Sequence, residues 1–87
     1  MSTGIYLDDV PPGRYGVQPL RAMLQAAGVT LEDAAPAVGV TPEFLSMVTN
    51  GRSRPSLPVA ARLARLVGSP IEECFSASML GLPRRRR

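Results

Sequence analysis

The sequence contains no histidine, no lysine, no tryptophan and only one cysteine among its 87 residues. Without histidine or lysine it cannot form a Ser-His-Asp or Cys-His catalytic arrangement, a Schiff-base lysine or a P-loop lysine. One cysteine excludes an internal disulfide framework and, in the absence of histidine, a Cys/His zinc cluster. We therefore expect a protein that is not an enzyme and that uses no metal, cofactor or small-molecule substrate.

Long apolar runs are also missing, because no stretch approaches the roughly 18 residues that suggest a membrane span. The hydrophobic content of 45% is nevertheless ordinary for a globular chain. A chain of this length buries only one modest core. Its first residues lack the positively charged region and apolar stretch of a secretion signal. We expect one cytoplasmic domain without a membrane partner.

Positive charge is carried by arginine alone and is unevenly placed. Ten arginines and seven acidic residues give a net charge of +3, but the last four residues are all arginine. Without Arg84–Arg87, six arginines face seven acids and the net charge is −1. Residues 1–50 hold two arginines and five acids, whereas residues 51–87 hold eight arginines and two acids. Electrostatic attraction to an anionic partner must come from the second half.

Proline, glycine and small polar residues divide the chain into helix-sized segments, and no segment alternates like a strand. Residues 1–18 have no helical period, which predicts an irregular N-terminal arm. A helix begins at Pro19 and ends before Gly28, since proline favours the first position and glycine follows the last. A second helix is capped by Thr30 and ends at Gly39.

Two further helices have similar signals at their ends. Thr41 caps a third helix over residues 42–50, and Ser56 caps a fourth that continues to Gly68. The second helix contains a defect, because Pro36 removes a backbone hydrogen bond in its interior. We expect a kink or an early 3₁₀ ending there.

The segment Ser69–Glu72 has the pattern of a capping box and predicts a short fifth helix through Phe75. Cys74 falls on an apolar position of that helix and is expected to be buried. The predicted organisation is thus an irregular arm, an all-α domain of five helices over residues 19–76 and a tail over residues 77–87.

Two capped helices on either side of a short glycine turn form the most informative pattern. They lie in the segment GVTLEDAAPAVGVTPEFLSMVTNG, which predicts a helix-turn-helix. Here the sequence resembles the Cro/cI-type, or XRE-type, helix-turn-helix family, which includes the lambda repressor DNA-binding domain. The resemblance includes Ala35 at the helix crossing, Gly39 in the turn, Leu45 and Val48 on the buried side, and the closing SLPVAARLARLVGSPIEECF. It implies a five-helix, lambda-repressor-like domain that binds double-stranded DNA.

The resemblance also implies that the third helix lies in the major groove and presents its first turns to base edges. Its candidate base-reading residues are Pro42, Glu43, Phe44, Ser46 and Met47. The common bidentate readers, Arg, Lys, Asn and Gln, are absent from residues 42–49. Glu43 can accept from a cytosine amino group or simply complement the helix dipole. Phe44 and Met47 can touch thymine methyl groups or serve as packing residues.

Candidate phosphate contacts are better supplied than base contacts. The resemblance implies that the loop after the third helix grips the DNA backbone, and backbone amides at helix starts can also donate to phosphate oxygens. By contrast, Leu31 stands where many relatives have a glutamine that braces the reading helix or contacts phosphate, so neither contact is expected from this position. The candidate phosphate-binding residues are Thr30, Thr41, Asn50, Arg52, Arg54 and, more weakly, Arg21.

Two functional hypotheses remain open. The first is a sequence-specific DNA-binding regulator, a dimeric repressor of phage, plasmid or antitoxin type. Met79, Leu80 and Leu82 would form its homodimer contact, and Arg84–Arg87 would add phosphate contacts or act only as a solubilising charge run. The second is a protein-interaction module that binds a protein partner through the exposed face of the third helix. We favour the first because Asn50–Arg54 supplies DNA anchors that protein binding does not require.

Overall fold

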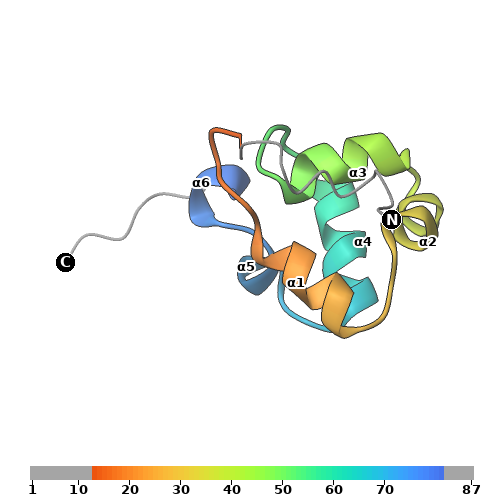
Figure 1. Cartoon of the computed structure of the whole chain (residues 1–87). Helices are drawn as coiled ribbons and strands as arrows, with labels where there is room; N and C mark the ends of the chain where they lie inside the picture. The colour runs from red at the N-terminus through yellow and green to blue at the C-terminus, as the bar shows by residue number, and fades with distance from the viewer. Residues whose placement is uncertain (1–12, 82–87) are drawn as a thin grey trace.

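The computed structural model describes residues 13–81, and every regular element in this range is an α-helix (Figure 1). The all-α class expected from the sequence is confirmed. A sixth helix, α6, lies where an irregular tail was expected. Within this range no helix has the length and apolar character needed to cross a membrane. The helices are α1 (Pro19–Ala26), α2 (Leu31–Val38), α3 (Pro42–Thr49), α4 (Leu57–Val67), α5 (Ile71–Cys74) and α6 (Ala77–Leu80).

Side-chain caps fix the beginnings of α2, α3 and α4, as the sequence predicts. The hydroxyl oxygens of Thr30, Thr41 and Ser56 each accept from the amide three residues later, at 3.1, 3.1 and 3.3 Å. Each cap satisfies one of the amides that have no partner inside the first turn. The predicted starts of these three helices are therefore confirmed.

Pro36 does not end α2 early. The helix remains α-helical to Val38 and closes at Gly39, which has the left-handed φ of +82°. Pro36 lies on the exposed side of the helix, so water can satisfy the carbonyl that lost its amide partner. The expected 3₁₀ ending is wrong because the glycine closure follows normally.

The capping box predicted at Ser69 is also absent. Pro70 is the residue that precedes α5, no side chain caps this helix, and it ends at Cys74. The Ser69 amide donates to the carbonyl of Ala64 at 3.1 Å, in the bond that closes α4 after Gly68. Ser69 therefore completes the preceding helix.

One apolar cluster joins all six helices in the described part of the chain. Helix α2 packs on α3 and α4, and α1 packs on α3 and α5. The cysteine expected to be buried is fully buried and free. The buried apolar residues are Leu20, Leu24, Leu31, Ala34, Ala35, Val38, Leu45, Val48, Ala60, Leu63, Ala64, Cys74, Phe75 and Met79.

Helix α6 belongs to this core. Met79 is only 1% exposed, and Leu80 is half-buried against the same cluster. Met79, expected in a dimer contact, therefore packs inside its own chain because Ser76 starts a helical turn that points it inward. Leu82 and Arg84–Arg87 lie outside the described residues.

The segment before α1 is irregular, as predicted, but it is bonded to the domain. Backbone amides of Gly13, Tyr15 and Gln18 donate to three consecutive carbonyls at the end of α3, at distances of 2.8 to 3.1 Å. Figure 1 shows this segment beside α6 and the loop that follows α3. The packed body therefore extends from Gly13 to α6, beyond the predicted limits of 19 and 76.

Candidate nucleic-acid interface

Helices α2 and α3 form a helix-turn-helix held by a tight turn. The left-handed Gly39 directs the chain back, and the Val40 amide donates to the Ala35 carbonyl at 3.0 Å. Leu45 and Val48 are fully buried on the inner side of α3. One face of α3 is thus fixed by the core, and the opposite face is available for recognition.

The outer face of α3 carries the predicted base-reading residues in different degrees of exposure. Glu43 is exposed, and Met47 is 40% exposed. Pro42 and Ser46 are half-buried. Phe44 is partly buried against the core cluster, so packing accounts for a large part of its side chain. Glu43 and Met47 are the members of the set that this helix presents most openly.

The start of α2 shows why the missing glutamine matters. Leu31 is fully buried, so it packs in the core and supplies no polar brace to α3. Glu32 and Asp33 are exposed in the same turn. Acidic side chains at a helix N-terminus complement the helix dipole, but they do not attract phosphate. No arginine occurs in residues 31–49, so backbone amides supply the positive potential of this unit.

The loop after α3 separates its two arginines. Arg52 is exposed, and its amide donates to the Met47 carbonyl at 2.8 Å, which fixes the backbone beside the last turn of α3. Arg54 points toward α6, where its Nε donates to the Met79 carbonyl at 2.8 Å. Asn50 is half-buried and ends α3. Both arginines are exposed, and the Arg54 side chain is bonded to α6.

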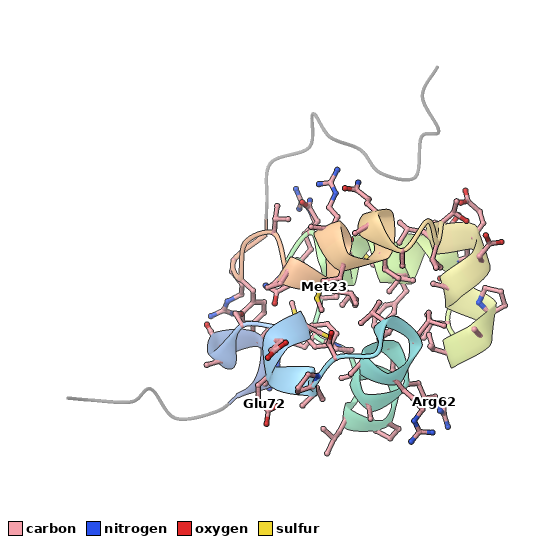
Figure 2. The ribbon with its side chains drawn as sticks, turned by 90° about the horizontal axis from the view of Figure 1, so that it is seen from below. Met23, Arg62 and Glu72 are labelled. Carbon is pink, nitrogen blue, oxygen red and sulfur yellow. The ribbon has the colours of Figure 1, made fainter. Side chains whose placement is uncertain are left out.

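The remaining arginines of the body lie on other segments, and Arg14 is beside this loop because its neighbours Gly13 and Tyr15 donate to the carbonyls of Asn50 and Gly51. Arg21 is half-buried on α1, and the Arg14 guanidinium lies over the Tyr15 ring at 5.4 Å from its centre. Arg62 Nη1 donates to the Val38 carbonyl at 3.5 Å, at the C-terminus of α2. Figure 2 shows Arg62 on the edge of the molecule opposite α1. Its position favours complementing the α2 dipole.

Gln18 is a residue of this region that the sequence did not identify. It is 2% exposed, and its Nε2 donates to the carbonyls of Tyr15 and Gly16 at 3.0 Å each. Its Oε1 accepts from the Ser76 amide at 2.7 Å. A polar residue before a proline in an irregular segment gives no sequence signal for burial, because its partners come from distant parts of the chain.

Comparison with known proteins identifies the same unit. A protein-family model described as helix-turn-helix matches residues 20–74. This range begins within α1 and ends with α5, so it includes all of α2, the turn and α3. No curated protein and no solved structure matches the chain.

Proposed function

Because this chain belongs to the XRE-type, lambda-repressor-like helix-turn-helix family, we propose that it binds double-stranded DNA sequence-specifically and represses transcription as a homodimer. Membership makes the chain a DNA-binding helix-turn-helix regulator. The family consists of DNA-binding regulatory domains and is not generally enzymatic. The specific operator, the dimer and a phage, plasmid or antitoxin setting belong to the proposal.

The observation that carries the proposal is the amphipathic placement of α3. Its inner face is locked by Leu45 and Val48, while Glu43 and Met47 face outward and Arg52 follows at its end. A helix held in this way can enter a major groove with its side chains at fixed positions. An exposed cation beside the helix end suits the adjacent phosphate backbone.

We propose that Arg52 is the principal side-chain phosphate contact. Asn50 lies beside it, and Arg21 on α1 is a secondary candidate. Amides of the first turn that Thr30 caps, and the Glu43 amide in the turn that Thr41 caps, would donate to phosphates. Pro42 has no N–H, and the Phe44 amide donates to Thr41. These neutral donors suit a helix-turn-helix whose side chains carry Glu32 and Asp33, since they provide positive potential without added cations.

Base reading would depend on a small set of polar and apolar contacts. Glu43 would accept from a cytosine amino group, and Ser46 can donate or accept. Met47 and the exposed edges of Phe44 and Pro42 would contact thymine methyl groups. Because arginine and lysine are absent, guanine recognition by a bidentate cation is not expected on α3.

A homodimer would match two half-sites about 34–36 Å apart on one side of the DNA. Leu80 and Leu82 remain the proposed contact residues, while Met79 holds α6 in the core. Two identical domains on one operator bind more tightly than one because the second binding event is intramolecular. We infer a palindromic operator.

The second candidate function is binding of a protein partner through the same face of α3. The observation in its favour is the acidic character of Glu32, Asp33 and Glu43, all exposed at the starts of α2 and α3. A pull-down that loses its partner on Phe44→Ala, while DNA affinity is unchanged, would support it.

A DNA titration at several salt concentrations tests the first proposal, with the sequence upstream of the chain's own gene as probe. Arg52→Ala should reduce the salt slope by about 0.9 log unit, the value for one released phosphate contact. Arg65→Ala on α4 is the matched exposed control and should leave the slope unchanged.

Glu43→Gln should change the DNA sequence that the protein prefers. An upstream probe bound no more tightly than unrelated DNA would contradict sequence-specific regulation.

A further inference from the structure

Helix α6 is bonded at both ends to the segments that surround the end of α3. At its start, the Ser76 amide donates to Gln18 Oε1 at 2.7 Å. At its other end, the Met79 carbonyl accepts from Arg54 Nε at 2.8 Å. Gln18 lies in the segment bonded to α3, and Arg54 lies in the loop that follows α3. We call α6 with these two residues the α6 clasp.

We propose that the α6 clasp positions the turn over residues 49–54, and that Gln18 and Arg54 are positioning residues for DNA binding. The proposal rests on the DNA-binding function proposed above. It separates the two arginines of this loop by role: Arg52 contacts phosphate, and Arg54 holds the backbone that presents Arg52.

Gln18 joins three parts of the chain through all of its polar groups. Its main-chain amide donates to the Thr49 carbonyl at 2.8 Å. Its side-chain amide donates to Tyr15 and Gly16, and its side-chain oxygen accepts from α6. Because Gln18 is 2% exposed, its side-chain bonds are shielded from water. Inside a protein a hydrogen bond is stronger than in water, and a buried polar group without one is more unfavourable. A shift of α6 therefore displaces the end of α3.

The Arg54 side chain lies beside the C-terminal end of α6. Gly81 follows the helix with a left-handed φ of +74°, and a Cβ added there would lie 2.7 Å from Arg54 Nη2. The guanidinium thus occupies the space beside a glycine while its Nε bonds the helix carbonyl. The planar guanidinium group therefore lies against the end of α6.

The body of the domain holds α6 in place, so the clasp has a fixed reference. Met79 and Phe75, within and just before α6, are each 1% exposed in the core. Gly51, in the turn, accepts the Tyr15 amide and has no room for a side chain beside Gly16. The turn therefore contacts the segment before α1 through Gly51 and contacts α6 through Arg54.

A matched pair at Ser76 tests the contact between α6 and Gln18. Ser76 has φ −68° and Phe75 is extended, so proline fits the backbone at position 76. Ser76→Pro and Ser76→Ala both lose the hydroxyl cap on the Met79 amide, but only proline also removes the amide that donates to Gln18. Comparison of the two variants therefore reports the Gln18 contact, because the proline ring removes the donor and also occupies the place of the amide hydrogen beside Gln18 Oε1.

We expect Ser76→Pro to bind operator DNA about five-fold more weakly than Ser76→Ala, the order of one hydrogen bond, with an unchanged salt slope. In the DNA-free protein, the amide chemical shifts of Gly51 and Arg52 should move in the proline variant and not in the alanine variant. Urea unfolding of both variants corrects the affinities for the folded fraction. Equal affinities, or unmoved amides, would overturn the positioning role of Gln18.

The arginines provide the second comparison. Arg54→Ala should weaken binding while the salt slope stays at the wild-type value, whereas Arg52→Ala should lower the slope by about 0.9. A slope reduced equally by both variants would overturn the positioning role of Arg54 and make it a phosphate contact. A wild-type chain that binds no DNA would instead overturn the proposed function, and the amide shifts would still decide whether α6 sets the turn.

Discussion

At the scale of single residues, the glycines at the end of α3 allow two backbones to meet. Gly51 has φ +79°, and a Cβ added there would overlap the backbone of Gly16. A Cβ on Gly13 would in turn overlap the backbone of Gly51 and Arg52. Neither position has room for a larger residue because main-chain atoms cannot move aside as a flexible side chain can.

Substitution of Gly51 tests this contact. Gly51→Ala should lower the free energy of unfolding by about 2 kcal/mol more than Gly68→Ala, because overpacking adds to the strain of a left-handed alanine. Gly68 is the matched control, since its φ is +70° and nothing lies within 4 Å of an added Cβ. Urea unfolding measures both variants. Equal decreases in the free energy of unfolding would mean that the segment before α1 does not restrict the space at Gly51.

The thiol of Cys74 makes a prediction about pH. Burial, with a smaller contribution from Glu73, raises the pKa of this thiol above its ordinary value of 9.0. As pH rises, the thiol therefore loses its proton in the unfolded chain before it does so in the folded chain. The contribution of this thiol to the free energy of unfolding is complete well below pH 9 and is lost as pH rises toward the folded pKa. The free energy of unfolding should decline as pH rises above about 8.5.

Cys74→Ala is the control for that decline. The variant should be less stable at neutral pH, because it leaves a small cavity, but its free energy of unfolding should vary less with alkaline pH. Urea titrations at constant ionic strength compare the two slopes. Parallel profiles would show that the thiol does not account for the pH dependence.

At the scale of elements, α2 contains a proline, Pro36, in its interior, where proline is unfavourable for a helix. Pro36 is exposed and lies inside the helix, where it removes one backbone hydrogen bond and supplies no core contact. Helix α2 is therefore maintained by its Thr30 cap, its Gly39 ending and the burial of Leu31, Ala35 and Val38. Tertiary packing offsets the weak propensity of the segment.

Pro36→Ala should raise the free energy of unfolding by about 1 kcal/mol, because the restored hydrogen bond exceeds the entropy that proline removed from the unfolded chain. Pro58→Ala is the matched control: Pro58 is also exposed but lies in the first turn of α4, where no intrahelical bond is missing. Thermal unfolding of both variants measures the difference. A larger gain at position 58 would contradict this explanation.

At the scale of the whole molecule, charge is separated along the chain. Residues 51–87 contain eight of the ten arginines, whereas five of the seven acids lie in residues 1–50. The exposed starts of α2 and α3 carry three of those acids. We therefore expect DNA to be attracted by the second half and read by a helix from the first, which favours a marked dependence of affinity on salt.

Replacement of Arg84–Arg87 by glutamine tests the contribution of the terminal run. The salt slope should decrease by about 0.9 log unit for each phosphate that the run neutralises, with the preferred sequence unchanged. Titrations with operator and unrelated DNA separate these effects. An unchanged slope on both probes would leave the run a solubilising segment.

The sequence by itself determined the helices α1 to α5 and the family. Local chemistry sufficed for this: Thr30, Thr41 and Ser56 cap their own first turns, Gly39 and Gly68 close their own helices, and the order of these signals marks the helix-turn-helix. In each case the capping residue and the backbone group that it bonds lie within a few residues of each other, so the sequence alone is enough to predict the cap.

Only the tertiary structure decided which groups Gln18, Arg54 and Met79 contact. Gln18 and Ser76 are separated by 58 positions, and Arg54 and Met79 by 25, so no local pattern links them. The sequence predicted a phosphate contact for Arg54 because this residue follows the third helix, and a dimer contact for Met79 because residues 77–87 were expected to form a tail. The fold instead closes α6 onto the core, since burying Met79 and Phe75 removes apolar surface from water. That closure brings distant polar groups together at the end of the recognition helix.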